Sequence, residues 1–156
     1  MLKYYNYDIV FQEIPNEVTL AVNITNCPNR CKGCHSKHLQ QDIGKELDEN
    51  CIDGLMDTYG AAITCFCFMG GDAAPHRVAE LADYIRQKFP ALKTAWYSGC
   101  NKLPGNGFDV RVFNFIKIGS YIEEMGDLRS STTNQRLYQI VPDGTMNDVS
   151  YLFRQH

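Results

Sequence analysis

Three cysteines lie close together near the amino terminus, at Cys27, Cys31 and Cys34. Their spacing is C-x3-C-x2-C, so three thiolates could close around one metal centre. With His38 the pattern extends to C-x3-C-x2-C-x3-H, which supplies the four tetrahedral ligands of a zinc site. With the three thiolates alone, a [4Fe–4S] cluster would keep one iron open to a small molecule. These residue types leave zinc and iron–sulfur open, and a metal-free structural loop is a third alternative.

Four further cysteines are scattered along the chain. The total of seven is odd, which argues against a closed disulfide framework. We expect these four to be small buried hydrophobic side chains, because two of them lie in the apolar segment 63–69 (ITCFCFM). They are Cys51, Cys65, Cys67 and Cys100.

Length and composition exclude several classes of protein. A chain of 156 residues predicts one domain, spanning 1–156. Its 44% hydrophobic and 21% charged residues are ordinary for a globular protein and unlike a disordered one. The net charge of −3 does not favour nucleic-acid binding. Since there is neither an apolar run of membrane-spanning length nor a signal-peptide core, we expect a cytoplasmic protein without a membrane partner.

The elements that must position the cysteines alternate between strand and helix. The segment 63–69 is apolar at nearly every position, which is typical of a strand covered on both faces in a parallel sheet. The order βαβαβ with short links predicts an α/β fold with a parallel sheet and right-handed crossovers. The predicted strands are 18–25, 63–69, 94–97, 113–118 and, more weakly, 135–141; the predicted helices start at Glu46 and end at Gly60, and start at Pro75 and end at Pro90.

Four of these strands end in a segment that could contact a ligand. The first runs into the cysteine loop, and the next ones into residues 70–72 (GGD), 98–99 (SG) and 119–120 (GS). In parallel α/β folds ligands bind in the crevice at the carboxyl ends of the strands. We therefore expect the functional site at this edge.

The cysteine motif after a first strand, with a second strand ending in Gly-Gly-acidic, resembles the radical S-adenosylmethionine (SAM) superfamily. Within it, residues 31–35 (CKGCH), 69–72 (MGGD) and 132–136 (TTNQR) are similar to the family of anaerobic ribonucleoside-triphosphate reductase activating proteins. The resemblance covers residues 18–140. It implies a single-domain partial (β/α) barrel of the radical SAM type, with a [4Fe–4S] cluster and SAM as cofactors.

The resemblance also implies a cluster ligand set. Cys27, Cys31 and Cys34 would ligate three irons, and the amino and carboxylate groups of SAM would chelate the fourth. No catalytic residue beyond these ligands is implied, because the cofactor carries the chemistry.

The remaining implied contacts are with SAM. Gly70 and Gly71 would let the backbone approach the methionyl amine, and the Asp72 carboxylate would bind its positive charge. The superfamily usually has an aromatic residue directly before the third cysteine, next to adenine. Here Gly33 stands at that position and His35 follows the cysteine, so these two residues are the candidates for the adenine contact.

The implied reaction is reductive cleavage of SAM to a 5′-deoxyadenosyl radical, which generates a glycyl radical on the anaerobic ribonucleotide reductase. The chain after residue 141 is short for a substrate lid, which favours a protein substrate. A flavodoxin- or ferredoxin-type electron donor is the second expected partner, guided by basic residues such as Arg30, Lys32 and Lys37. Two alternatives stay open: a radical SAM enzyme acting on a small molecule, and a zinc-binding interaction domain. No physical role for residues 132–136 follows from the sequence.

Overall fold

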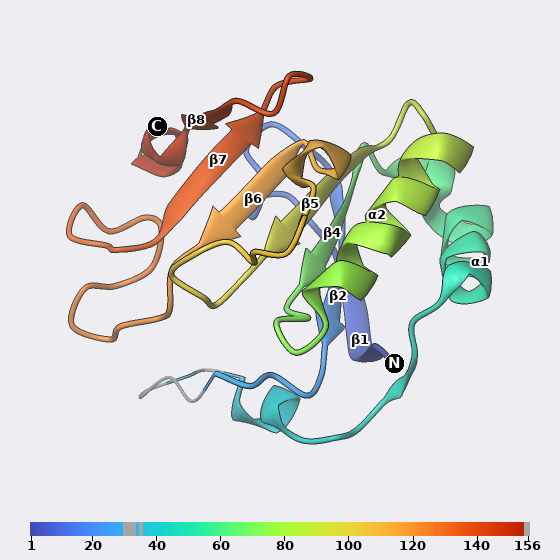
Figure 1. Cartoon of the computed structure of the whole chain (residues 1–156), viewed down its shortest axis with the longest axis horizontal. Coiled ribbons are helices and arrows are strands. Elements are labelled where there is room, and N and C mark those ends of the chain that lie inside the picture. Colours follow the sequence, from blue (N-terminus) through green and yellow to red (C-terminus); the bar gives the residue numbers. More distant parts are fainter. Residues whose placement is uncertain (30–33, 35, 155–156) are drawn as a thin grey trace.

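The computed structural model describes residues 1–29, 34 and 36–154 as a mixed sheet of eight strands with two α-helices (Figure 1). The strand order is β3-β1-β2-β4-β5-β6-β7-β8, open at both ends in the described part of the chain. The strands are β1 Lys3–Val10, β2 Thr19–Ile24, β3 Lys45–Glu46, β4 Cys65–Met69, β5 Lys93–Tyr97, β6 Phe115–Ile118, β7 Arg136–Ile140 and β8 Met146–Asp148; the helices are α1 Glu49–Tyr59 and α2 Pro75–Lys88.

The centre of the sheet is parallel. Strands β2, β4, β5 and β6 pair in parallel in that order, α1 precedes β4 and α2 joins β4 to β5. This confirms the predicted βαβαβ order. Since parallel strands all end at the same edge, the loops after β2, β4 and β5 lie together below the sheet in Figure 1.

Antiparallel strands flank this centre, and the sequence patterns did not predict all of them. β7 fulfils the weak prediction at 135–141, but it runs antiparallel to β6. β1 pairs antiparallel with β2, from Tyr4 opposite Ile24 to Val10 opposite Thr19, and was not predicted. The middle of β1 is exposed, so it has no buried face to mark it as a strand. The two- and three-residue strands β3 and β8 were also not predicted.

The predicted start of α1 at Glu46 was wrong, whereas its predicted end at Gly60 is confirmed. Glu46 belongs to β3, and the helix is capped by Asp48, whose carboxylate accepts a hydrogen bond from the Cys51 amide at 2.9 Å. Gly60 has a φ of −56° and does not adopt the left-handed conformation. The chain instead continues into a 3₁₀ turn, Gly60–Ala62. The boundaries of α2 agree with the prediction from Pro75 and Pro90.

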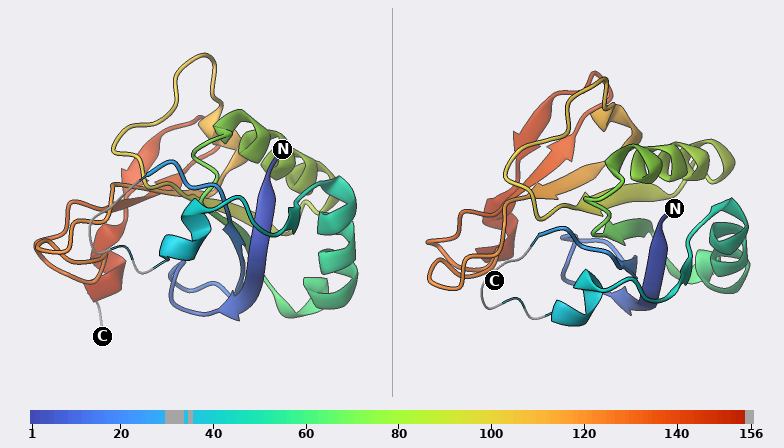
Figure 2. Two further views of the ribbon diagram at one scale, coloured as in Figure 1. Left: turned by 90° about the horizontal axis from the view of Figure 1, so that it is seen from below. Right: turned by 60° about the horizontal axis from the view of Figure 1, so that its bottom comes forward.

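Side chains pack on both faces of the sheet, as predicted for β4. On one face, strand residues such as Phe66, Phe68 and Trp96 contact α1 and α2. The two helices lie side by side over this face in Figure 2. On the other face, Cys65 and Cys67 are fully buried beneath residues from the flanking loops and the carboxyl-terminal segment. The expectation of small buried side chains is thus met for Cys65 and Cys67, but not for Cys51 and Cys100, which are half-buried.

The observed sheet is a mixed α/β sheet, and the partial barrel of the radical SAM type stays a prediction. Among the described residues, no helix is long and apolar enough to cross a membrane.

Candidate metal centre

The cysteine loop leaves the sheet at the carboxyl end of β2. Cys27 and Cys34 are both half-buried with free thiols. The Cys27 amide donates to the Leu39 carbonyl at 2.9 Å, which closes the loop at its base. Three residues of the expected site, Cys31, Gly33 and His35, lie outside the described residues.

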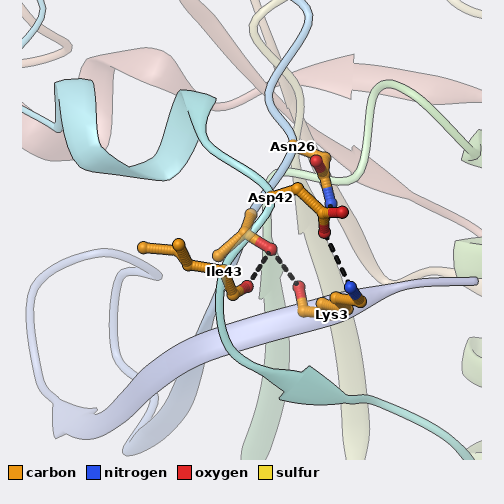
Figure 3. Close-up of polar contacts among 5 residues, drawn as sticks. Lys3, Asn26, Asp42 and Ile43 are labelled. Carbon is orange, nitrogen blue, oxygen red and sulfur yellow. Dashed lines mark hydrogen bonds and ion pairs between the residues drawn. The ribbon is translucent and has the colours of Figure 1, made fainter.

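The returning end of the loop is fastened to β1 and β2 by side chains. The buried Thr25 hydroxyl lies 2.7 Å from the Ile43 carbonyl and 3.2 Å from the Lys3 carbonyl (Figure 3). The Asp42 carboxylate accepts hydrogen bonds from Lys3 Nζ at 2.8 Å and Asn26 Nδ2 at 3.1 Å. Its hydrogen bond with Lys3, followed by that with Asn26, lowers the pKa of Asp42. Both ends of the cysteine loop are therefore tied to the sheet.

The carboxylate of Asp72 joins three loops at this edge. Its Oδ2 accepts from Asn29 Nδ2 and from the Gly99 amide, both at 2.8 Å. Its Oδ1 accepts from the Ser98 hydroxyl at 2.6 Å. Asn29 belongs to the cysteine loop, Asp72 follows β4, and the other two residues follow β5. The structure thus brings together segments that the sequence placed at separate strand ends.

The two glycines before Asp72 have structural roles of their own. Gly70 and Gly71 have φ values of +112° and +95°, which other residues rarely adopt. The Gly70 carbonyl accepts a hydrogen bond from Trp96 Nε1 at 2.7 Å. A Cβ atom at position 71 would lie 2.5 Å from Val78 Cγ2 of α2. Glycine is therefore required at position 71 by the packing of α2, whatever ligand binds nearby.

This packing predicts that Gly71→Ala lowers the free energy of unfolding. We expect a loss of about 2–4 kcal/mol from the positive φ and the clash with α2. The matched control is Gly54→Ala on the exposed side of α1, where an added Cβ meets nothing within 4 Å. That variant should gain about 0.5–1 kcal/mol from helix propensity. Urea denaturation of the apo-protein measures both, and equal stability of the two variants would contradict the packing role.

A cavity of about 580 Å³ borders the cysteine loop. This volume lies within the usual range of small-molecule sites, about 300–1,000 Å³. Its walls come from the cysteine loop, the end of β4 and the long segment between β6 and β7. They are formed by Cys34, Ser36, Met69, Tyr121, Gly126, Asp127, Ser130 and Gln135.

A family model described as a 4Fe-4S single cluster domain matches residues 17–104 of this chain. The match covers more than half of the chain and includes all three cysteines of the loop. The chain belongs to the family of 4Fe-4S single cluster domains. Family membership supports an iron–sulfur cluster, rather than zinc, as the metal centre of this chain. Comparisons with curated proteins and with solved structures give no significant match.

The described thiols of this cluster domain fit the donor set that a cluster needs. Thiolates are the ligands, so a cysteine must be able to lose its proton. Burial raises the pKa of Cys65 to about 12 and that of Cys67 well above its ordinary value. Burial also raises the pKa of Cys27, although hydrogen bonds from Asn29 act in the opposite direction. The two groups differ in access: Cys65 and Cys67 are fully buried in the core, whereas Cys27 and Cys34 are half-buried in a loop that a cluster could reach.

The neighbourhood of Cys34 agrees with this assignment. Its sulfur accepts a hydrogen bond from the Ser36 amide at 3.4 Å, a contact that also suits a thiolate. His38, the fourth ligand in the zinc alternative, is exposed and its ring packs on Tyr5 with centroids 5.2 Å apart. Among residues 1–29, 34 and 36–154, no three His, Cys, Asp or Glu side chains are gathered as a metal site. That set does not include Cys31, so the ligation by the three cysteines of the loop stays a prediction.

Residues 132–136, which had no role in the sequence analysis, brace the loop beside this cavity, and Gln135 lines it. The Thr132 hydroxyl donates to the Met125 carbonyl at 2.9 Å, and Thr133 donates to the Gly126 carbonyl at 3.1 Å. Asn134 Nδ2 donates to the Ser120 carbonyl at 3.0 Å. These bonds fold the segment after β6 back on itself. Side chains that bond to their own neighbouring loop leave no hydrophobic periodicity, so no sequence pattern indicated this role.

Proposed function

We propose that this chain is a radical SAM activase that generates a glycyl radical on an anaerobic ribonucleotide reductase. The observation that carries the proposal is the cavity of about 580 Å³ that extends from Cys34 to Met69 at the end of β4. A small molecule in this cavity would contact the cysteine loop and the end of β4, directly before the Gly-Gly-Asp loop, while Asp72 itself lines a separate cavity of about 210 Å³. This arrangement supports SAM as a ligand of the same site as the cluster.

Two sets of residues would bind the cofactors. Cys27, Cys31 and Cys34 would hold the cluster. When bound, the cluster and SAM supply one-electron cleavage of SAM to methionine and a 5′-deoxyadenosyl radical. Gly33 and His35, outside the described residues, stay the candidates for the adenine contact.

Asp72 would bind the amino group of SAM. A carboxylate has about four acceptor positions, two on each oxygen. Two hydrogen bonds occupy Oδ2, whereas one hydrogen bond, from Ser98, occupies Oδ1. Oδ1 therefore keeps an acceptor position for an ammonium group. The Gly70 carbonyl, which accepts from Trp96, has a second lone pair that could do the same.

The proposal is tested by SAM binding and cleavage. We expect the anaerobically reconstituted protein, once reduced, to change its EPR spectrum on addition of SAM and to release methionine and 5′-deoxyadenosine in equal amounts. Asp72→Asn should weaken SAM binding by about 10- to 100-fold, because a hydrogen bond between charged groups is lost. The control is Asp57→Asn on the exposed side of α1. If the EPR spectrum of the wild-type protein does not change on addition of SAM, the radical SAM proposal is wrong, although the iron–sulfur assignment stands.

A radical SAM enzyme acting on a small molecule is the second candidate function. A further cavity of about 210 Å³ shares Asp127 and Gln135 with the first and is also lined by Tyr97, Lys117 and Arg129. Such a polar extension favours a small substrate beside the cofactors. Activation of a partner protein and conversion of a small molecule are separated by the experiment described in the Discussion.

A further inference from the structure

One hydrogen-bonded side chain links the cysteine loop to the loops after β4 and β5 and lies outside the expected ligand set. Asn29 stands two residues after Cys27, and its Nδ2 donates to Asp72 Oδ2 at 2.8 Å. We propose that Asn29 is a positioning residue, which holds the cysteine loop at a fixed distance from Asp72. The effect of this positioning on SAM binding rests on the proposed function.

The site around the Asn29 side chain is built to hold the amide in one place. A Cβ atom at Gly99 would lie 2.8 Å from Asn29 Nδ2, so glycine at that position leaves room for the amide. The Gly99 amide donates to the same oxygen of Asp72 as Asn29 does. Two loops thus share one acceptor, and a side chain at position 99 would have to displace the Asn29 amide.

The orientation of the amide is also determined. An ionised carboxylate can only accept hydrogen bonds, so the NH₂ group of Asn29 must face Asp72. Its Oδ1 then faces Cys100 Sγ, 3.9 Å away, which can act as a weak donor. On the backbone side, Cys27 Sγ lies 3.8 Å from the Asn29 carbonyl oxygen. Asn29 therefore contacts a predicted cluster ligand through its backbone and Asp72 through its side chain.

The other anchors of the cysteine loop act elsewhere. Thr25, Asn26 and Asp42 tie the loop to β1 and β2 at its base, next to Lys3. Their contacts fix where the loop starts and returns, but they do not reach the loops after β4 and β5. Among the described residues of the cysteine loop, Asn29 makes the side-chain contact with the Asp72 carboxylate.

The first test is hydrogen exchange in the apo-protein, which needs neither cluster nor SAM. Asn29→Ala should raise the exchange rates of the backbone amides at positions 29 and 99 by about five- to tenfold, because one partly buried hydrogen bond is lost. Asn50→Ala, on the exposed side of α1, is the matched control and should leave these rates unchanged. Equal rates in the two variants would overturn the inference.

The second test separates positioning from general stability. Asn29→Asp places two carboxylates against each other and should open the loop further. The double variant Asn29→Ala/Asp72→Ala should exchange at residue 29 no faster than Asp72→Ala alone, because the hydrogen bond is already lost in the single variant. Additive increases in the two single variants and the double variant, all folded by circular dichroism, would contradict a pairwise role.

The third test uses the reconstituted protein. Asn29→Ala should keep its iron, because no cluster ligand is changed, and should raise the SAM concentration for half-maximal EPR change by about 10-fold. Unchanged SAM dependence would overturn the link from loop position to SAM binding. If wild type itself ignores SAM, the proposed function fails, while the exchange experiments still decide whether Asn29 positions the loop.

Discussion

Replacing Cys27, Cys31 or Cys34 with alanine is expected to abolish stable cluster binding. Each change removes one of three thiolates from a site that has no spare ligand in the predicted set. Loss of a single ligand should reduce the bound iron below about a tenth of the wild-type content. Even mutation of a residue that only hydrogen-bonds to a ligand typically lowers metal affinity 10- to 100-fold. Iron and sulfide analysis after anaerobic reconstitution measures this. Full iron content in Cys31→Ala would refute the ligand assignment.

The remaining four cysteines provide controls within the same chain. Cys65 and Cys67 are fully buried in the core of the sheet, where no cluster could reach them. Cys51 lies in α1, on the side of the sheet that packs against the helices. Cys100 is the stringent control, because it lies next to Asn29 at the site itself. Alanine at any one of these four positions should retain the iron.

The second large effect is expected when the proposed partner is added. The reduced protein with SAM should turn over slowly alone, because a deoxyadenosyl radical must be shielded from solvent before it forms. Adding an anaerobic ribonucleotide reductase should yield a stable glycyl radical on that partner. The radical would appear as an EPR doublet at the expense of SAM.

The decisive control for this prediction is a change in the partner. Replacing its radical-bearing glycine with alanine should remove the doublet while leaving the cluster and SAM binding of this chain intact. Fast SAM cleavage without any partner, together with modification of an added small molecule, would instead support the second candidate function. The cavity beside Tyr97 and Lys117 would then be the place to look for that substrate.

The parallel core of the fold could be predicted from hydrophobic patterns, and the antiparallel flanks could not. β4 is apolar on both faces because side chains pack against it from both sides. β1 is held mainly by backbone pairing with β2, and its middle is exposed, so its sequence carries no such pattern. The start of α1 was predicted three residues early because the apolar spacing was followed back past the cap, Asp48.

The sequence predicted the place of the candidate site better than its construction. The strand-end rule correctly grouped the cysteine loop with Asp72 and the loop after β5. Asn29 was not singled out, because nothing in an isolated asparagine indicates which distant carboxylate it will contact. The reading of the glycines was incomplete for a similar reason: the clash at Gly71 is with Val78, seven residues later in a helix whose placement only the fold determines.

The hydrogen bond from Trp96 to the Gly70 carbonyl has a practical consequence for following this loop. Trp96 is the single tryptophan of the chain, it is almost fully buried, and it lines a small cavity together with Asp72. All indole fluorescence of the protein therefore originates beside the Gly-Gly-Asp loop. A ligand that displaces this loop would change the emission maximum or intensity, so its arrival can be timed by stopped-flow mixing without attaching a dye.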